Sequence, residues 1–489
     1  MYNRMHFENL PRGIPQTSTE KGAAPRALWM NPQTLRSADF WAYKPGKIIL
    51  GGTQDRMIGL SDNRHLMTVA GSRAGKGTSV IVPNLLLYPG SVLVLDPKGE
   101  NATLTAERRG AGRGIPAGGL GHDVYVIDPF RTADVPDEYR AGFNPMAGLD
   151  PDSPTYIDDC DGIADALVIE RDNDKDSHWT SAARLVLRGL IAWVGASTGP
   201  HDLIEMRRLL YLPSDGEGTG EFETLLVDMS VSETAHGVPA EMANMLIGMG
   251  SEERGSVLST VRDNIGFLSS PPMAKTLSGD ARAVDLKAWK FGKSSVYLCL
   301  PAGRLHRHNR FFRLFLNRLF AAVEENPETP EIPALMLLDE MHVLGRMAVL
   351  ETAAGLFAGY GVRIWSIWQD LNQLKDIYKA RWETFMGNAG LLQFFGMNDL
   401  TTLEYVSKRL GTSSVMQISQ GEISTGQAVS GFSGKSKSIQ SAPLLSIDEV
   451  GYFFSRQSEN QLVIYPGSDP IFMQRVPYWS NFYKEYVAS

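Results

Sequence analysis

The glycine-rich stretch GSRAGKGTS at 71–79 constrains the fold of this chain more than any other feature. It follows an apolar β-type run, HLMTVA, and opens a run with helical spacing, VIVPNLLLY. Strand, glycine-rich turn and helix in this order are typical of a phosphate-binding loop, because backbone N–H groups and the helix N-terminus then face the phosphates. The predicted nucleotide-binding residues are Gly71, Ser72, Arg73, Ala74, Gly75, Lys76, Gly77, Thr78 and Ser79. We expect Lys76 to reach the β- and γ-phosphates and to act in catalysis.

The stretch departs from the usual pattern G-x-x-x-x-G-K-[ST] at two positions. Ala70 stands where the first glycine is expected, and Gly77 stands where a hydroxyl normally binds Mg²⁺. Thr78 or Ser79 would have to substitute, or water would fill the position; we take Thr78 as the predicted metal ligand. A glycine turn with a solvated lysine is the alternative interpretation of this motif alone.

An acidic pair supplies the second half of such a site. In PALMLLDEMHVLG at 333–345, an apolar strand from Leu335 to Leu338 ends in Asp339 and Glu340. We expect Asp339 to hold Mg²⁺ through water and Glu340 to polarise the attacking water. A helix N-cap with a solvated neighbour is the plainer interpretation, but the P-loop upstream in the same alternating pattern favours the catalytic one.

A further strand, VRIWSIW at 362–368, ends in Gln369. This glutamine either senses the γ-phosphate and positions water, or caps the next helix. Hydrolysis in ring ATPases often needs an arginine from the neighbouring subunit, and Arg363 and Arg409 are candidates between which spacing does not decide. Arg363 is included in the predicted catalytic set with Lys76, Glu340 and Gln369.

Apolar strand-like runs alternate with helical runs from residue 65 to about 128 and again after 290. This alternation predicts an α/β fold with a mostly parallel sheet covered on both faces. The intervening segment has few strand signals and many helix-period runs. We therefore predict an N-terminal extension at 1–47, a nucleotide-binding domain formed by 48–154 and 286–489, and an inserted all-α domain at 155–285.

Charge and cysteine content narrow the classes of function. The formal net charge is −8, so any DNA contact has to be local, such as a lined channel. Acidic residues concentrate at 158–162, 170–176 and 214–223, within the predicted all-α domain. Cys160 and Cys299 are the only cysteines, which excludes a disulfide framework and fits a reducing compartment.

Other runs predict structure more than chemistry. His178 and His342 have no partner at metal-ligand spacing, so both are interpreted as surface or capping residues. The polar stretch at 419–442 predicts a loop or mobile segment. QLVIYPGSDPIFMQRVPYW at 461–479 predicts a final strand pair that closes the sheet. The apolar run at 185–196 carries Arg188 and is too short to span a membrane, so it predicts a buried helix.

Taken in order, these motifs resemble one family. SRAGKGTSVIVPNLL, VLVLDPKGEN, VYVIDPF, LLDEMHVLG, IWQDLNQL and FFGMNDLTTLEYVSKRLG are similar to stretches of the TraG-type coupling ATPases of type IV secretion and conjugation. The resemblance runs from about residue 48 to 480, and that family also tolerates glycine directly after the P-loop lysine. It implies a RecA-like motor that uses ATP and Mg²⁺. Asp96, Lys98 and Glu100 match the family's DxKGE stretch, which we expect near the nucleotide or a subunit interface.

The resemblance implies an ATP-driven coupling protein that recruits relaxase-bound single-stranded DNA to a type IV secretion channel and helps to translocate it. The alternative is a nucleotide-switched receptor for secreted protein effectors, which would bind them on the acidic helical domain. A chromosome-processing translocase is a third interpretation, against which the DxKGE and FFGMNDLTT stretches count. The resemblance also implies that the protein forms a homo-oligomer, a hexameric ring when it is active. Without nucleotide we expect a monomer.

Typical members of the family carry transmembrane helices ahead of the motor, whereas the first 64 residues here contain no such segment. We expect a cytoplasmic protein that a membrane-anchored partner recruits to the bacterial inner membrane.

Overall fold

The computed structural model describes residues 27–53, 55–169, 177–214, 219–279, 282–420 and 435–488. The chain divides into two compact units. Unit 1 comprises Met1–Tyr88 and Trp365–Lys484, and unit 2 comprises Pro89–Ile364 and Glu485–Ser489. The chain passes from unit 2 back to unit 1 within strand β8 (Val362–Trp368).

Unit 1 contains a mixed sheet whose strands follow the order β2-β1-β13-β12-β9-β3-β8. β3 pairs in parallel with β8 and with β9, whereas the other pairs from β9 to β2 are antiparallel. β12 and β13 form the strand pair predicted from the C-terminal run, so the pairing is confirmed. The pair does not close the sheet as predicted, because it lies between β9 and β1. The remaining strands are β1 (Ile48–Gly52), β2 (Met57–Leu60), β3 (His65–Ala70), β9 (Ala389–Phe395), β12 (Asn460–Ile464) and β13 (Ile471–Gln474).

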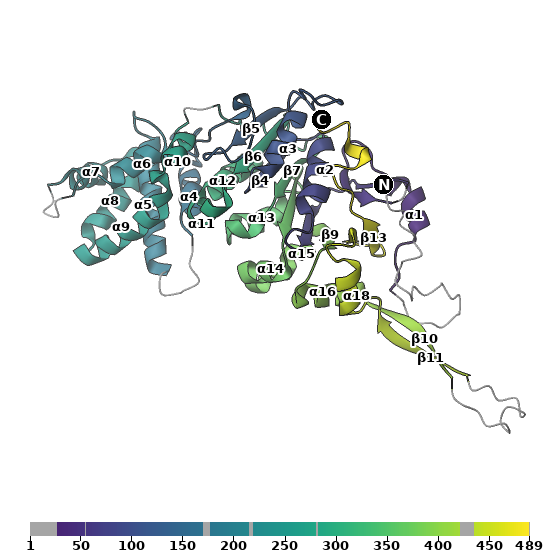
Figure 1. The fold of residues 1–489 in the computed structure, drawn as a ribbon. Coiled ribbons are helices and arrows are strands. Elements are labelled where there is room, and N and C mark those ends of the chain that lie inside the picture. Colours follow the sequence, from purple (N-terminus) through teal and green to yellow (C-terminus); the bar gives the residue numbers. More distant parts are fainter. Residues whose placement is uncertain are drawn as a thin grey trace, which may run out of the picture. The chain divides into compact units, whose positions relative to one another are not determined.

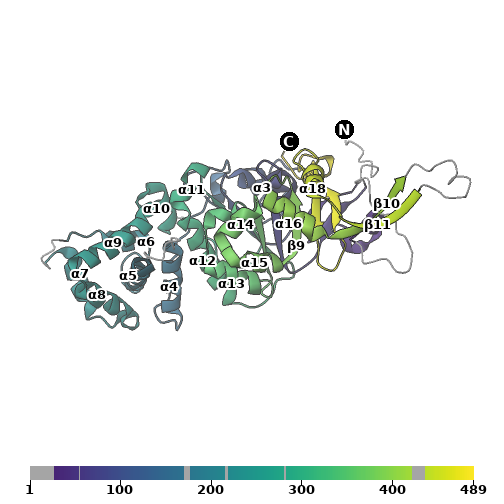
Figure 2. The ribbon, with the colours of Figure 1, turned by 90° about the horizontal axis from the view of Figure 1, so that it is seen from below.

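Helices accompany this sheet, and a separate ribbon extends from them. The helices are α1 (Pro32–Ser37), α2 (Val82–Leu87), α14 (Leu371–Tyr378), α15 (Trp382–Gly387), α16 (Leu400–Leu410) and α18 (Ile447–Phe453). α16 packs against α18, and the ribbon formed by β10 (Thr412–Gln420) and β11 (Lys435–Pro443) projects from them (Figures 1 and 2).

The ribbon corrects one sequence prediction. The sequence predicts a polar loop or mobile segment at 419–442, but β10 and β11 continue into this stretch from both sides, with Thr412 opposite Pro443 and Gln420 opposite Lys435. Residues 421–434 lie outside the described ranges. The ladder of a two-stranded ribbon is made by backbone groups, so its sequence can lack the hydrophobic signal by which strands are recognised.

Unit 2 contains four neighbouring parallel strands in the order β7-β4-β6-β5. The strands are β4 (Val92–Asp96), β5 (Asp123–Ile127), β6 (Ser294–Cys299) and β7 (Ala334–Leu338). Every residue of β4 and β7 is buried, as expected for parallel strands covered on both faces. The α/β class predicted from the alternating pattern is therefore confirmed.

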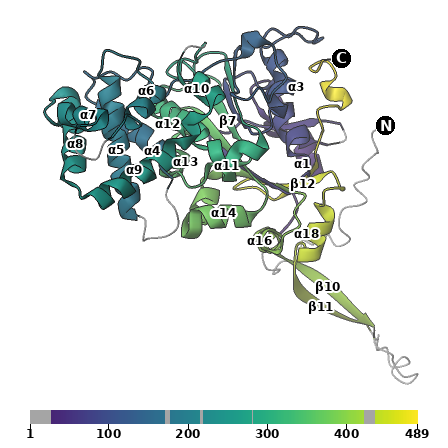
Figure 3. The ribbon, with the colours of Figure 1, turned by 60° about the vertical axis from the view of Figure 1, so that its left-hand side comes forward.

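Among the described residues between β5 and β6, helices replace strands. These helices are α4 (Tyr156–Leu167), α5 (Ser177–Gly195), α6 (Leu203–Leu210), α7 (Glu221–Ser230), α8 (Val238–Gly248), α9 (Ser251–Ile265) and α10 (Pro271–Leu277). They gather around α5, which contacts α4, α8 and α9 (Figures 1 and 3). The apolar run with Arg188 forms the C-terminal part of α5, and the Arg188 guanidinium donates to Asp161 of α4 at 3.4 Å. The acidic stretch at 170–176 lies outside the described residues.

Four further helices complete unit 2: α3 (Glu100–Arg109), α11 (Leu305–His308), α12 (Arg310–Glu324) and α13 (Ala348–Leu356). α12 packs against α4. The boundaries predicted for an inserted domain at 155–285 stay a prediction.

Candidate nucleotide-binding site

The P-loop of unit 1 begins where β3 ends. β3 is the central strand of a parallel trio, with Val69 opposite Trp368 of β8 and Ala70 opposite Phe395 of β9. Gly75 has a φ of 94°, which L residues with a side chain rarely adopt. One turn of π-helix (Gly77–Ile81) follows and continues into α2. The predicted order of strand, glycine-rich loop and helix is therefore present.

Close packing explains the need for glycine at Gly71. A Cβ atom on Gly71 would lie 2.1 Å from the Gly396 carbonyl oxygen at the end of β9. Gly396 has a φ of 62°, and its own Cβ would lie 2.3 Å from the Ala74 Cβ. Gly77 differs, because a Cβ there would meet no atom within 4 Å. The absence of a hydroxyl residue at Gly77 is therefore not imposed by packing.

Thr78 and Ser79 begin the helix. The Thr78 hydroxyl donates to the Gly75 carbonyl at 3.2 Å, which leaves the oxygen lone pairs available to a cation. Ser79 is buried, and its N–H donates to the same carbonyl at 2.9 Å. The helix is also held by Asn84, whose amide bonds both the N–H and the C=O of Ile49 in β1. Which hydroxyl takes Mg²⁺ stays a prediction.

Gln369 follows β8 at the end of the sheet from which the P-loop emerges, because Trp368 is opposite Val69. Asp370 caps α14: its carboxylate accepts from the Gln373 N–H at 2.9 Å. The Gln369 N–H donates to the Gln373 side chain at 3.1 Å. Asp370, and not Gln369, therefore provides the helix cap. Of the two interpretations of Gln369, the γ-phosphate sensor is the one that stays a prediction.

The predicted acidic pair of unit 2 follows β7. Glu340 has a φ of 52°, and its N–H donates to Asp339 at 3.0 Å. The Glu340 carboxylate lies 3.4 Å from His342 Nδ1, so this histidine is a neighbour of the acidic pair. Mg²⁺ usually takes one or two protein carboxylates plus phosphate oxygens and water, and Asp339 fits such a set. In the described ranges, no three His, Cys, Asp or Glu side chains converge to hold a metal by themselves.

Asp96 lies beside Asp339, because Leu95 of β4 is opposite Leu338 of β7. It is 1% exposed and accepts from the Ala102 N–H at 2.8 Å and from the Asn101 amide at 3.2 Å. Burial raises the pKa of Asp96 to about 7, although hydrogen bonds from the backbone N–H groups of Ala102 and Asn101 lower it, and the charges of Asp339 and Glu100 raise it further. Asp96 therefore fixes the first turns of α3, a role that the motif match did not indicate. Lys98 and Glu100 are exposed.

The two candidate arginines lie in different surroundings. Arg363 is in the first residues of β8 and is 2% exposed. Arg409 is exposed on α16, beside a hollow of about 360 Å³ that Glu383 and Tyr405 also line. An arginine that acts on a neighbouring subunit has to reach the surface, so the burial of Arg363 argues against its predicted role and Arg409 fits it better.

Sequence reasoning missed Arg475, which follows β13. Its guanidinium donates to the Ala74 carbonyl within the P-loop. The Tyr478 N–H donates to the Thr78 carbonyl at 2.9 Å, so the C-terminal segment contacts the loop and the helix after it. A charged residue at the end of an otherwise apolar strand run was the available signal.

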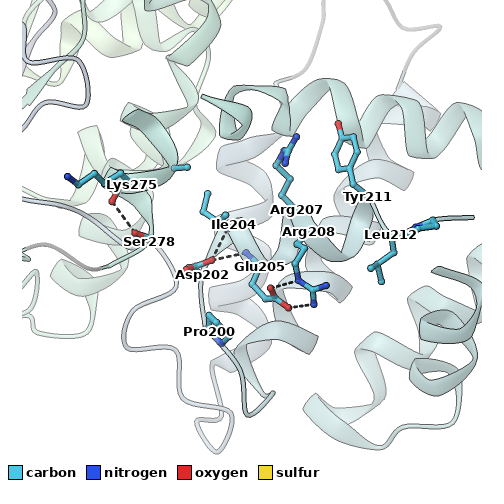
Figure 4. A pocket seen from close by; sticks show the side chains of 12 residues that line it. Pro200, Asp202, Ile204, Glu205, Arg207, Arg208, Tyr211, Leu212, Lys275 and Ser278 are labelled. Carbon is cyan, nitrogen blue, oxygen red and sulfur yellow. Dashed lines mark hydrogen bonds and ion pairs between the residues drawn. The ribbon is translucent and has the colours of Figure 1, made fainter. Parts of the chain in front are cut away.

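A second hollow, of about 630 Å³, lies in the helical part of unit 2 between α6 and α10 (Figure 4). Its acidic side chains are engaged: Asp202 accepts from two N–H groups of α6, and Glu205 forms two hydrogen bonds with Arg208. The Arg207 guanidinium lies 4.6 Å over the Tyr211 ring, and Lys275 is exposed on α10. Its polar character is therefore mainly cationic.

Every helix in the described ranges is too short or too polar to traverse a lipid bilayer. A phosphate-binding loop after a central parallel strand, with an acidic pair after another parallel strand, defines the class of RecA-like P-loop nucleotide-binding folds. Within that class, residues 20–488 match the family model described as type IV secretory system conjugative DNA transfer. The chain belongs to this family.

Curated relatives carry names from conjugation. The chain is 29% identical over 417 residues to the conjugal transfer protein TraG of Agrobacterium fabrum, covering 83% of this chain and 59% of TraG. It is 27% identical over 427 residues to the protein VirD4 of the same organism, covering 85% of this chain and 59% of VirD4. The chain thus spans a little under three fifths of the length of these two relatives.

Solved structures share the fold. The conjugative coupling protein TrwBΔN70 in complex with sulphate has a TM-score of 0.65 at 15% identity, over 93% of this chain and 96% of that one. TrwB in complex with ADP and Mg²⁺ has a TM-score of 0.65 at 14% identity, over 96% of this chain and 100% of that one. At this identity the likeness concerns the fold alone, and it confirms the predicted RecA-like fold.

Proposed function

We propose that the chain is an ATP-driven coupling protein that recruits relaxase-bound single-stranded DNA to a type IV secretion channel and helps to translocate it. The observation that carries this proposal is the P-loop itself, in which a parallel strand, a loop with Gly75 at a φ of 94° and a helix follow one another. This order directs backbone N–H groups toward a phosphate. Membership of the conjugative DNA transfer family supports the substrate and the channel as partners.

The proposed cofactors are ATP and Mg²⁺, and TrwB solved with a non-hydrolysable ATP analogue and with ADP and Mg²⁺ supports this choice. Lys76 would bind the β- and γ-phosphates, and Thr78 and Asp339 would hold the metal, which neutralises charge on the phosphate oxygens. Glu340 would accept a proton from the attacking water, and Gln369 would orient that water. Arg409 of a neighbouring copy would stabilise the charge that develops on the γ-phosphate.

Assembly and location belong to the same proposal. We expect a homo-oligomer, because an arginine supplied in trans requires a neighbouring copy. A hexamer in the active state is what the resemblance to the coupling ATPases implies. Recruitment to the cytoplasmic face of the inner membrane by a membrane-anchored partner would bring the motor to the channel.

Steady-state ATP hydrolysis with and without single-stranded DNA tests the motor. We expect DNA to stimulate hydrolysis, and we expect Lys76→Ala to abolish it because the phosphates lose their cation. An assembled oligomer that binds Mg·ATP and never turns it over, with or without DNA, would contradict the motor and leave the nucleotide-switched receptor.

The cationic hollow between α6 and α10 favours a receptor role for the helical part within the same protein. Arg207 and Lys275 would contact anionic groups of a protein substrate. We expect Arg207→Ala combined with Lys275→Ala to weaken co-purification of the relaxase while DNA-independent hydrolysis stays unchanged. Equal recovery of relaxase with the parent and the double variant would contradict this role.

A further inference from the structure

Arg475 is a buried cation in contact with the P-loop. Its side chain belongs to the residue directly after β13, and the residue is 7% exposed. The Nη1 atom donates to the Ala74 carbonyl, and Nη2 donates to the Arg456 carbonyl at 3.0 Å. The Arg475 N–H donates to the Glu459 carbonyl at 2.8 Å, which fixes the backbone from which the side chain extends.

Burying a guanidinium is costly unless its N–H groups are bonded, so this arrangement needs compensation. The two carbonyls provide part of it, and the guanidinium also lies 4.8 Å from the centre of the Phe395 ring, where a cation is attracted by the π-electrons. Burial lowers the pKa of Arg475 to about 10, so the side chain is still protonated at neutral pH. The loop therefore has a permanent positive charge packed against it.

The bond to Ala74 also determines the direction of the next N–H group. A peptide unit is planar and trans, so the Ala74 carbonyl and the Gly75 N–H point in opposite directions. Because Arg475 holds the carbonyl on the protein side of the loop, the Gly75 N–H is directed away from Arg475. A phosphate-binding loop uses N–H groups directed in this way.

Close packing holds the Arg475 guanidinium against the Ala74–Gly75 segment of the loop. A Cβ on Gly75 would lie 3.1 Å from Arg475 Nη1, so the guanidinium is packed tightly against the loop at this position. The two residues are far apart in sequence but belong to the same unit.

From these contacts we propose that Arg475 is a positioning residue of the nucleotide site. It orients the Ala74–Gly75 peptide so that the Gly75 N–H faces the phosphates, and it adds positive charge behind the loop. This inference rests on the nucleotide binding proposed above. It differs from the role of Lys76, because Arg475 acts through the backbone of the loop and does not contact the nucleotide.

Calorimetric titration of the full chain with Mg·ADP tests the inference. We expect Arg475→Met to raise the Kd by at least about tenfold, since a hydrogen bond to a charged group and its charge are lost. Arg475→Lys, which keeps the charge, should bind more tightly than Arg475→Gln, which keeps a donor without charge. Arg456→Met is the matched control, because its side chain is exposed and only its backbone carbonyl contacts Arg475.

Circular dichroism and thermal unfolding of each variant establish that it is folded at the temperature of the titration. A folded Arg475→Met with a Kd within about twofold of the parent, a change under half a kcal/mol, would overturn the inference. If Arg475→Met does not fold, the comparison of Arg475→Lys with Arg475→Gln decides, and equal affinities would overturn it.

Lys76→Ala distinguishes a failure of the role inferred for Arg475 from a failure of the proposed nucleotide site. If the parent binds Mg·ADP, Lys76→Ala loses it and Arg475→Met does not, the inference fails and the proposed nucleotide site stands. If the parent itself binds no Mg·ADP, both fail.

Discussion

At the scale of single residues, Gly71 and Gly77 of the P-loop differ in the space available for a side chain. Gly71 has no room for a side chain, whereas Gly77 opens the helix with free space around its Cα. Gly77 is also not among the glycines with a positive φ, so its backbone conformation does not require glycine. The two positions therefore predict opposite outcomes for the same kind of substitution.

We expect Gly77→Ser to fold as well as the parent or to gain up to about 1 kcal/mol, because serine loses less backbone entropy than glycine. It also restores a hydroxyl at the usual metal position, so Mg·ADP binding should persist. Gly71→Ala should weaken binding strongly, since its Cβ would clash with the Gly396 carbonyl. Thermal unfolding and Mg·ADP titration check both; equal losses in the two variants would contradict this reading of the loop.

His122 of unit 2 makes stability depend on pH. Its Nδ1 lies 3.1 Å from Arg109 and its Nε2 lies 3.0 Å from the Pro89 carbonyl, so the ring is neutral with the proton on Nε2. Burial, followed by the charge of Arg109, lowers the pKa of His122 to about 3. Below pH 6.5 the unfolded chain takes up a proton that the folded chain does not, so this contribution to stability, complete above pH 6.5, is lost as pH falls toward 3.

We expect the difference in unfolding free energy between the parent and His122→Gln to shrink by about 1.4 kcal/mol for each pH unit below 6.5. Urea unfolding at pH 7.5, 6 and 5 measures this difference. A difference that stays constant over this range would show that His122 is not held neutral.

The site residues that the sequence predicts and the contacts that it does not reveal differ in the range of their sequence signals. Lys76, Asp339 and Gln369 each follow an apolar strand, and a local pattern is enough to place them. The contact of Arg475 with Ala74 joins residues far apart in the sequence, so it could not be predicted from spacing. Asp96 bonds residues nearby in the sequence, but the motif did not reveal that it is buried. Arg363 was predicted because it is an arginine near the right strand, and sequence alone does not reveal that the fold buries it.

At the scale of elements, α12 connects the acidic pair of unit 2 with the helical region. Arg313 of α12 is buried, and its guanidinium bonds two sets of carbonyls. Nη1 donates to Leu344 at 3.0 Å and to Arg346 at 2.8 Å, in the segment that follows Asp339 and Glu340. Nε donates to Ala166 at 3.2 Å, in the last turn of α4. The end of α4 and the segment after β7 are therefore held by one side chain.

Arg313→Met should cost at least about 3 kcal/mol of stability, because several buried carbonyls lose a charged donor. Hydrogen exchange should accelerate both at 341–346 and in the last turn of α4. Arg307→Met, at an exposed arginine of α11, is the control and should change neither. Protection that persists at both segments in Arg313→Met would contradict this link.

At the scale of the whole molecule, the predicted residues are divided between the two units of the chain. Lys76, Thr78 and Gln369 belong to unit 1, and Asp339 and Glu340 belong to unit 2. The chain crosses between these units in β8, between Ile364 and Trp365. A substitution of the P-loop in unit 1 and a substitution of the acidic pair in unit 2 therefore have distinct expected defects, which are loss of nucleotide binding and loss of turnover.

Comparison of Mg·ATP binding and turnover in Glu340→Gln with those in Lys76→Ala tests the central claim most directly. We predict that Glu340→Gln binds Mg·ATP with nearly the affinity of the parent and hydrolyses it at least about a hundredfold more slowly, the usual loss when a general base is removed. Lys76→Ala should lose binding itself. Turnover by Glu340→Gln at the rate of the parent would contradict the account.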